Sequence, residues 1–310
     1  MDRRRHRTKL SRLGRQAIFM RILIVGGSGQ VGWELQRSLA PLGEVIVAPR
    51  AALDLCDPDS VGRVLEEFRP DTVVNAAAYT AVDAAETEPE RADAINHRSV
   101  AMLAVQAARS GCRLVHYSSD YVFDGSGTAP FAETHATGPL NAYGRSKLAG
   151  DQAIAASGCR HLILRTSWVH APRGANFVRS ILKLARERDH LRVVADQHGA
   201  PTSAELIADV TAHMLADSEA QSGTYHLAAR GETSWHEIAQ IVVIEARRLG
   251  AALTLAPDAI EPIPSSAFPS KAVRPLNSRL DTAKLRTSFG ITLPDWRQGI
   301  GRTVAELVAA

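Results

Sequence analysis

The sequence predicts the α/β class, with a doubly wound parallel sheet and a smaller C-terminal region. Short runs rich in β-branched residues alternate with stretches of helical periodicity in the first half of the chain. This alternation is typical of parallel strands joined by crossover helices that cover both faces of a sheet. A chain of 310 residues that is 45% hydrophobic can bury a sizeable core, which excludes a disordered protein.

The expected elements follow one another in regular order. Strands are expected at 21–25, 44–48, 71–75, 113–117 and 161–166. Helices are expected at 31–40, 58–68, 91–109 and 142–156. Asp57 is placed to cap the second helix, and Gly111 is placed to end the third.

The pattern loosens after about Trp168. Helices are still expected at 175–188, 204–216 and 235–249. Prolines then crowd residues 257–275, a stretch that makes a poor sheet component and a good pocket wall. We therefore expect a sheet-based domain at 20–167 and a substrate-binding region at 168–310 that can return a strand or helix to the first domain.

Residues 1–19 form a basic extension. They carry seven Lys and Arg against one Asp, or +6, which leaves −3 for the rest of a chain with net charge +3. The segment has no apolar run long enough for a signal peptide, and Met20 opens a strand-like run. An upstream start or an inert, disordered tail is the favoured interpretation, with a nucleic-acid arm or a transit peptide as alternatives.

Two absences narrow the protein class. No stretch of 18 or more apolar residues occurs, so we expect no membrane span. Cys56, Cys112 and Cys159 are far apart and form no Cys-x-x-Cys pair, which suits a reducing cytoplasm and argues against a structural metal site.

A glycine-rich turn joins the first strand to the first helix. Two registers overlap there, Gly27-x-Gly29-x-x-Gly32 and Gly26-x-x-Gly29-x-x-Gly32. Either one allows backbone N–H groups to approach a pyrophosphate at a helix N-terminus. Tight turns also use glycine, but the position between strand and helix favours a dinucleotide.

The end of the second strand indicates the type of nicotinamide cofactor. An acidic residue there would bind the ribose 2′-hydroxyl, whereas an arginine can pair with a 2′-phosphate. Arg50 follows this strand, and no carboxylate occurs before Asp54. NADPH is therefore favoured over NADH, although Arg50 could also be a solvated surface charge; Asp54 and Leu55 are expected beside the adenine.

Tyr143 and Lys147 predict acid–base chemistry. Residues four apart share one face of a helix, and a nearby cation lowers the pKa of a phenol toward working pH. Ser119, at the end of the fourth strand, could hydrogen-bond the same substrate oxygen. Tyr-x-x-x-Lys is common by chance, but after a glycine turn and a strand that ends in Ser118-Ser119 it becomes a strong signal.

These motifs resemble the extended short-chain dehydrogenase/reductase superfamily and its Rossmann-type fold. Within it, the chain is similar to the dTDP-4-dehydrorhamnose reductase family from Met20 to the C-terminus. The similarity is carried by Gly-Gln-Val-Gly-Trp-Glu-Leu at 29–35, Asn-Ala-Ala-Ala-Tyr-Thr-Ala-Val-Asp at 75–83, Ser-Asp-Tyr-Val-Phe-Asp-Gly at 119–125, Arg-Thr-Ser-Trp-Val at 165–169, Asp-Gln-His-Gly-Ala-Pro-Thr at 196–202 and Arg-Pro-Leu-Asn-Ser-Arg-Leu at 274–280.

The resemblance implies reduction of the C4 ketone of dTDP-4-dehydro-β-L-rhamnose by NADPH, the last step of dTDP-L-rhamnose synthesis. It implies that Tyr143 protonates the developing alkoxide, that Lys147 holds the nicotinamide ribose and that Ser119 polarises the ketone. By the same resemblance Asp120 contacts the sugar, and Trp168 packs against the deoxysugar ring.

The resemblance also implies cofactor contacts and a hydrogen-bond relay. The cofactor contacts would be Gly29, Gln30, Val31, Asp54, Leu55, Ala78, Tyr79 and Thr80. Asn96 would complete a relay to Lys147, with a capping or packing role as the alternative.

Members of the family differ in their use of metal. Some are dimers that hold Mg²⁺ with glutamates at the subunit interface, and others are metal-independent monomers. Glu34, Glu205 and Glu306 fall at the matching positions, and oxygen ligands suit Mg²⁺. The alternative is that these three glutamates are ordinary solvated charges.

Three competing interpretations stay open at this point. A nucleotide-sugar epimerase or dehydratase of the same superfamily would keep NAD⁺ bound, but Arg50 disfavours it. A regulatory subunit with this fold, like the one of eukaryotic methionine adenosyltransferase, would need neither Tyr143 nor Lys147. In the third, the basic extension is the main functional segment and binds nucleic acid or membrane; we expect neither partner.

Overall fold

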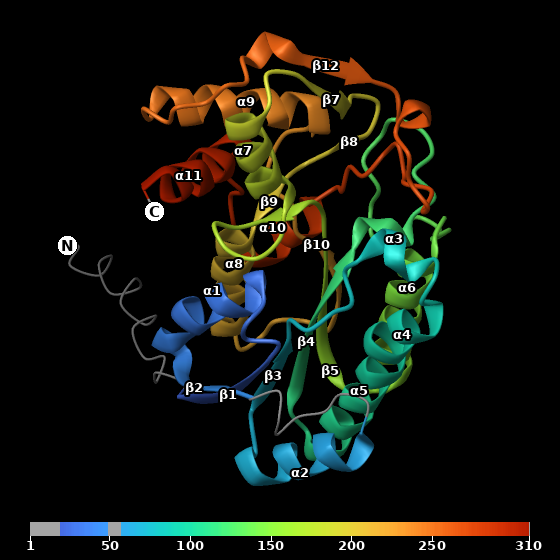
Figure 1. The fold of residues 1–310 in the computed structure, drawn as a ribbon. Helices are drawn as coiled ribbons and strands as arrows, with labels where there is room; N and C mark the ends of the chain where they lie inside the picture. The colour runs from blue at the N-terminus through green and yellow to red at the C-terminus, as the bar shows by residue number, and fades with distance from the viewer. Residues whose placement is uncertain (1–18, 49–56, 310) are drawn as a thin grey trace, which may run out of the picture.

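A six-stranded parallel sheet forms the centre of the molecule (Figure 1). The computed structural model describes residues 19–48 and 57–309. The strand order is β10-β5-β4-β3-β1-β2, and every neighbouring pair is parallel. The bounds are β1 Met20–Val25, β2 Gly43–Val47, β3 Thr72–Asn75, β4 Arg113–Ser119, β5 Arg160–Thr166 and β10 Gly223–His226. The predicted doubly wound α/β fold is confirmed.

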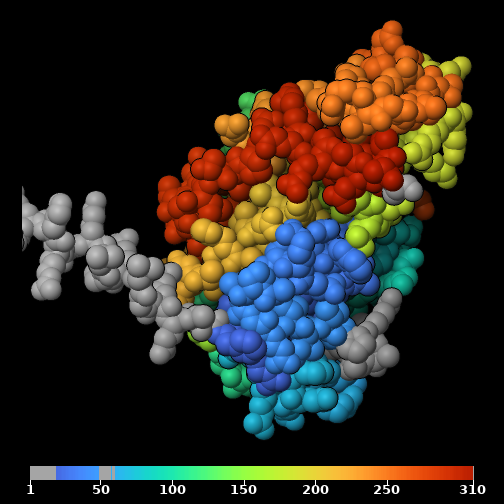
Figure 2. All heavy atoms as spheres, turned by 90° about the vertical axis from the view of Figure 1, so that its left-hand side faces the viewer, coloured from blue at the N-terminus to red at the C-terminus, as the bar shows by residue number. Residues whose placement is uncertain are grey.

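Helices cover both faces of this sheet because side chains alternate along each strand. On β1, Ile22 and Ile24 face a core formed with α1 (Gln30–Leu39) and α8 (Ala204–Ala216). Leu23 and Val25 point the other way, toward a second core. The helices on that face are α2 (Pro58–Phe68), α5 (Ser99–Ser110) and α6 (Ala142–Ala156). Figure 2 shows α1 and α8 side by side on the first face, below the C-terminal helix.

The long helix predicted at 91–109 is broken up in the structure. Its place is taken by α4 (Pro89–Asp93), a π-helical turn η2 (Ala94–Arg98) and α5, preceded by the short α3 (Val82–Ala85). The wide turn brings the backbone of Asn96 against α6, where a Cβ on Gly150 would collide with the Asn96 carbonyl oxygen. Gly111 ends α5 at φ +72°, as predicted.

The C-terminal region has a core of its own, built by α7 (Phe177–Glu187), α9 (Trp235–Arg248) and α11 (Trp296–Ala309). Two further helices of the region, α8 and α10 (Ala283–Phe289), pack together on the sheet. Both β10 and α8 come from this half of the sequence and join the central sheet and its cover. The short strands of the region are β6 Val169–His170, β7 Leu191–Val194, β8 His198–Gly199, β9 Thr202–Ser203, β11 Thr233–Ser234 and β12 Ile260–Ile263.

The proline-rich stretch differs from expectation in one respect. β12 pairs in parallel with β7, although Pro262 lies within it. A two-stranded sheet leaves one edge of each strand without a partner strand, and such an edge tolerates a missing N–H.

Among the described residues, no helix combines the length and apolar character needed to cross a membrane. The basic extension up to residue 18 lies outside the described residues.

Candidate active site

The turn between β1 and α1 requires its glycines. Gly26 has φ +82°, and a Cβ there would lie 2.5 Å from the backbone nitrogen of Ala77. A Cβ on Gly32 would collide with the Gly26 carbonyl oxygen, while the Gly29 N–H donates to that same oxygen at 3.0 Å. The predicted turn is therefore a backbone cradle: the segment after β3 and the first turn of α1 both approach Gly26 and Gly27 too closely for side chains at Gly26 and Gly32.

The N-terminus of α1 has the character of an anion site. Gly29 caps the helix without a side chain, and no acidic residue lies in the first turn, so the positive end of the helix is unopposed. Gln30 is held from the C-terminal region, since its Oε1 accepts from Asn176 Nδ2 at 2.8 Å. Val31 is partly buried beside it. Arg50, Asp54 and Leu55, the expected adenosine contacts, lie outside the described residues.

A second loop, after β3, lines the same edge of the sheet. Ala78 and Thr80 are exposed there, and Tyr79 is partly buried. The Asn96 side chain holds the loop, accepting from the Tyr79 N–H and donating to the Tyr79 carbonyl, both at 2.9 Å. Asn96 also donates to Ser146 Oγ at 3.0 Å. In the described part of the chain Asn96 thus makes no direct hydrogen bond to Lys147 and instead positions the 78–80 loop against α6.

Ser119 and Tyr143 are brought together at the end of β4. Ser119 ends β4 and is 6% exposed; its Oγ donates to Asp120 Oδ1 at 3.0 Å. Tyr143 is partly buried at the start of α6, and the Tyr121 ring meets its ring edge-on at 5.5 Å. Burial raises the pKa of Tyr143 to about 12, although a hydrogen bond with Ser119 opposes the rise. The expected lowering of this pKa by Lys147 is wrong for this arrangement, because burial outweighs every opposing contact.

Lys147 is buried and makes no ion pair with the described carboxylates. It is 1% exposed, and its Nζ donates to the Tyr117 carbonyl at 2.6 Å and lies 3.1 Å from His116 Nε2. Burial lowers the pKa of Lys147 to about 8, with Asp151 opposing the shift. An amine that titrates near neutral pH can both hold and release a proton, which is the property that acid–base catalysis needs.

Asp120 is a buried carboxyl group next to Ser119. It is 3% exposed, and burial raises its pKa to about 6 despite hydrogen bonds from Ser278 and Ser119. A site in which a carboxyl, a phenol and an amine all have pKa values displaced by burial is typical of catalytic centres.

Trp168 is held in an unusual conformation. Its φ is +50°, a left-handed value that is strained for a residue other than glycine. The ring stacks on Trp235 at a centroid distance of 4.0 Å, and a cavity of about 60 Å³ lies between Trp168, Trp235 and Phe177. Trp235 could not be predicted as a pocket residue, because an aromatic residue at the start of a helix has the same sequence pattern in a core and in a pocket.

The segment before Leu276 is tied to the cofactor side of the molecule. Arg274 binds both oxygens of Asp83 at 3.1 and 2.7 Å, and these bonds hold the pKa of that carboxyl well below its usual range. Asn141, the cap of α6, donates to the Val273 carbonyl at 2.8 Å. These contacts, which no local sequence signal indicated, bring the C-terminal segment against both α3 and the start of α6.

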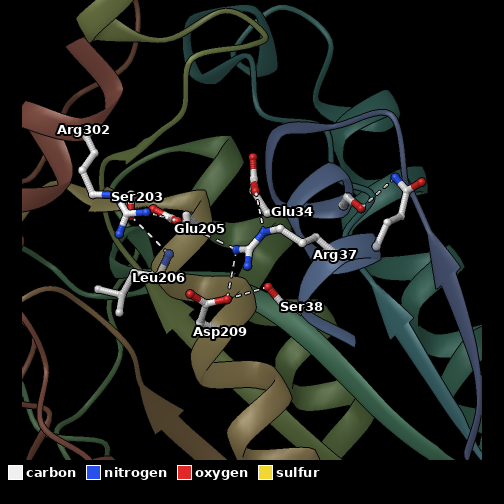
Figure 3. A network of polar contacts seen from close by, with 10 residues as sticks. Glu34, Arg37, Ser38, Ser203, Glu205, Leu206, Asp209 and Arg302 are labelled. Atoms are coloured by element: carbon white, nitrogen blue, oxygen red, sulfur yellow. Dashed lines mark hydrogen bonds and ion pairs between the residues drawn. The ribbon is translucent and has the colours of Figure 1, made fainter. Parts of the chain in front are cut away.

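The predicted Mg²⁺ site is not supported. Figure 3 shows Arg37 and Arg302 among the carboxylates that were expected to bind metal. Glu205 accepts from Arg302 at 2.6 Å, and Arg37 lies 3.7 Å from Glu34 and 3.9 Å from Glu205. Glu306 is exposed on α11. Over residues 19–48 and 57–309, no cluster of three acidic, His or Cys side chains could hold a metal ion, and guanidinium groups already pair with Glu34 and Glu205.

The fold and the site together define a class of enzyme. A glycine cradle at the first βα turn of a doubly wound sheet, with a serine, a tyrosine and a lysine at the neighbouring strand ends, is the arrangement of a short-chain dehydrogenase/reductase, a nicotinamide-dependent oxidoreductase. Residues 20–309 match the family described as RmlD substrate binding domain, and the chain belongs to that family.

Relatives and solved structures agree with this assignment. The chain is 49% identical to dTDP-4-dehydrorhamnose reductase of Burkholderia thailandensis, covering 94% of this chain and 100% of that one. It is 48% identical to the Escherichia coli reductase of the same name, covering 93% and 98%. The crystal structure of the Bacillus anthracis reductase in complex with NADP is 32% identical, with a TM-score of 0.85 over 93% of this chain and 99% of that chain.

Proposed function

We propose that this protein reduces the C4 ketone of dTDP-4-dehydro-β-L-rhamnose to give dTDP-β-L-rhamnose, with NADPH as the reductant. The observation that carries the proposal is the meeting of Ser119 and Tyr143 at the end of β4, one helical turn before the buried Lys147. High identity over nearly the whole length to reductases of this name supports the choice of substrate.

The residues of the cradle fit a dinucleotide. Because Gly26 and Gly32 carry no side chains, the turn closes tightly between β1 and α1, and the N-terminus of α1 offers N–H groups to phosphate. The exposed Ala78 and Thr80 lie on the neighbouring loop. When bound, the nicotinamide supplies the hydride that C4 receives.

The chain's own groups supply the proton and orient the ketone. Because the pKa of Tyr143 is about 12, its hydroxyl is protonated at neutral pH and can donate to the developing alkoxide. Ser119 can donate to the same oxygen when its hydroxyl turns from Asp120 to the substrate. Both donors reach the oxygen where negative charge develops, so they favour the transition state over the ketone.

The substrate side is assigned to the second region. We place the sugar against Trp168, whose large flat face suits a deoxysugar ring, with Asp120 beside it. The strained backbone at Trp168 and the stacked Trp235 support a fixed platform at this point. Residues 20–167 would then bind the cofactor and residues 168–310 the substrate, with the reaction taking place between them.

Arg50 carries the proposed preference for NADPH. A guanidinium beside the adenosine ribose pairs with a 2′-phosphate and has no such partner in NADH. Arg50→Ala should therefore weaken NADPH use and bring kcat/KM for the two cofactors closer together. Equal kinetics with NADPH and NADH before and after the substitution would remove this part of the proposal.

The main experiment follows cofactor absorbance with purified protein, NADPH and dTDP-4-dehydrorhamnose. Oxidation is expected, and Tyr143→Phe should lower kcat by about 10²- to 10⁴-fold because the proton donor is lost. Tyr225→Phe is the matched control, since Tyr225 is a buried tyrosine whose hydroxyl donates to Gln221 at 2.9 Å in another part of the sheet. No oxidation by the unchanged protein, or copurified NAD⁺ that external NADPH does not replace, would instead indicate an epimerase or dehydratase.

A further inference from the structure

A buried histidine behind Lys147 has no role in the mechanism above. His116 lies on β4 and is 1% exposed, and its two ring nitrogens face two different side chains. Nε2 lies 3.1 Å from Lys147 Nζ, and Nδ1 lies 3.2 Å from Nδ2 of Asn75, the last residue of β3. Asn75 is also 1% exposed. One buried line of polar contacts thus runs from β3 through β4 to α6.

The contacts of Asn75 decide which ring nitrogen of His116 carries hydrogen. Asn75 Oδ1 accepts from the Ala77 N–H at 3.2 Å, which leaves the Nδ2 group to face the histidine. An amide nitrogen only donates, so Nδ1 must be the acceptor. A neutral His116 ring therefore carries its hydrogen on Nε2, the atom that faces Lys147.

This hydrogen affects the charge that Lys147 can hold. An ammonium group has no lone pair and cannot accept from Nε2–H, whereas a neutral amine can. For a charged Lys147 to donate to Nε2, the ring hydrogen would have to move to Nδ1, where it would meet the Asn75 amide hydrogens. The second contact of Nζ, to the Tyr117 carbonyl, is open to both forms. The arrangement therefore favours the neutral amine.

The other charged groups around Lys147 do not reverse this preference. Asp151, one turn further along α6, favours the ammonium form, but it is buried and paired with Arg165 of β5 at 3.0 Å. Tyr143, one turn before on the same helix face, is neutral at working pH because of its raised pKa. Burial lowers the pKa of both His116 and Lys147, so burial favours the neutral form of each side chain.

We infer that His116, oriented by Asn75, is a positioning residue that stabilises Lys147 as a neutral amine each time Lys147 passes a proton toward Tyr143. The inference rests on the proposed function. After Tyr143 has protonated the alkoxide, its phenolate takes up the proton that leaves Lys147; the lone pair left on Nζ accepts from His116 Nε2–H. A proton from solvent then restores the ammonium, so each turnover consumes one hydride and one proton.

The test is the pH dependence of kcat in His116→Phe, which removes the Nε2–H donor. The unchanged enzyme should lose activity as the pH rises through about 8, where Lys147 loses its proton. Without Nε2–H the ammonium form of Lys147 is no longer disfavoured, so the midpoint of this activity loss should move up by about one pH unit. At pH 7, kcat should fall about tenfold, because the neutral amine is less stable. Asn75→Asp should move the midpoint in the same direction, because a carboxylate accepts from Nδ1–H and turns Nε2 into an acceptor for the ammonium. KM for NADPH should change less than twofold.

A merely structural role predicts something different. It would lower kcat evenly at all pH values and leave the midpoint in place, and that result would overturn the inference. His226→Phe is the matched control: His226 is equally buried, but its Nδ1 bonds the Phe131 carbonyl and it has no contact with Lys147. Its midpoint should equal that of the unchanged enzyme.

The histidine tautomer provides a test that needs no substrate. In ¹⁵N-histidine-labelled protein, His116, identified by resonance assignment of the unchanged protein, should show a protonated Nε2 and an unprotonated Nδ1. A proton on Nδ1 would overturn the inference even if no His116 variant folded well enough for kinetics. Because this measurement uses the protein alone, a failure to oxidise NADPH would count against the proposed function without deciding the tautomer.

Discussion

Two clusters of ionisable side chains on opposite parts of the sheet differ in whether their members form ion pairs. The interhelical cluster, Glu34, Arg37, Glu205, Asp209 and Arg302, joins α1, α8 and α11 (Figure 3). Its carboxylates all have a guanidinium within 4 Å, and the arginines are more than half exposed. The buried cluster, His116, Asp120, Tyr143 and Lys147, contains no such pair, and Lys147 faces a carbonyl and a histidine instead.

The presence or absence of ion pairs distinguishes groups that stabilise helix packing from groups suited to acid–base chemistry. Where opposite charges meet at a half-exposed surface, solvent and partner both stabilise the ionised forms, so the groups keep their ordinary charges and hold helices together. Where a carboxyl, a phenol and an amine are buried without an ion pair, the ionised forms are disfavoured and protons move at accessible pH. Experiments that remove a charge should therefore act on catalysis in one cluster and on local stability in the other.

The largest effect is expected for Lys147→Met. Methionine fills much of the space of the lysine stem but provides neither charge nor proton, so kcat should fall about 10²- to 10⁴-fold. The thermal midpoint should stay level or rise, because a buried amine is replaced by an apolar group. Steady-state kinetics and a thermal melt on the same sample check both parts. Activity within tenfold of the unchanged enzyme would move the acid–base role away from this cluster.

A smaller effect, on stability, is expected for Asp120→Asn. The pKa of Asp120 is about 6 in the folded protein against an ordinary 3.8, so the folded state binds the extra proton between about pH 4 and 6. Stability should therefore fall as the pH rises through this window, by about 3 kcal/mol in all, and stay low above it. Asparagine avoids this penalty, so the variant should be the more stable protein at pH 7.5 but not below pH 4, as urea unfolding at the two pH values would show.

The control for this prediction is Asp189→Asn, an exposed aspartate on the C-terminal region. Since solvent stabilises its charge, no gain in stability is expected at either pH. A gain for Asp120→Asn that is equally large at both pH values would mean that packing, rather than charge, limits stability at this position.

The sequence predicted the parts of the molecule that depend on local pattern. The strand and helix order of residues 20–166, the glycine turn and the bounds of α2 and α6 all follow from periodicity and capping, and the structure confirms them. The break in the helix predicted at 91–109 could not be read locally, because it depends on Gly150 of a different helix meeting Asn96.

The protonation states and contacts of the site residues also could not be predicted from local sequence. Residue types and spacing predict Ser119, Tyr143 and Lys147 as site residues, but the raised pKa of Tyr143 is set by burial, which no spacing encodes. His116 and Asn75 carry no motif, since their contacts arise only when β3, β4 and α6 are side by side. The metal site was over-predicted because the residue types of the three glutamates fit Mg²⁺. The positions of Arg37 and Arg302 relative to them depend on helix packing, which the sequence pattern does not show.

The smallest effect is expected in the interhelical cluster, for Arg37→Ala. Arg37 is 56% exposed, so loss of its ion pairs should lower stability by less than about 1 kcal/mol, less still at high salt, and leave kcat unchanged. The substitution leaves Glu34, Glu205 and Asp209 with one guanidinium fewer, so Mg²⁺ should raise the thermal midpoint of the variant but not of the unchanged protein. Arg63→Ala, which removes an exposed pair with Asp57 on α2, should gain no such response. A Mg²⁺-dependent midpoint or kcat in the unchanged protein, abolished by chelator, would show that the guanidinium does not take the place of a metal here.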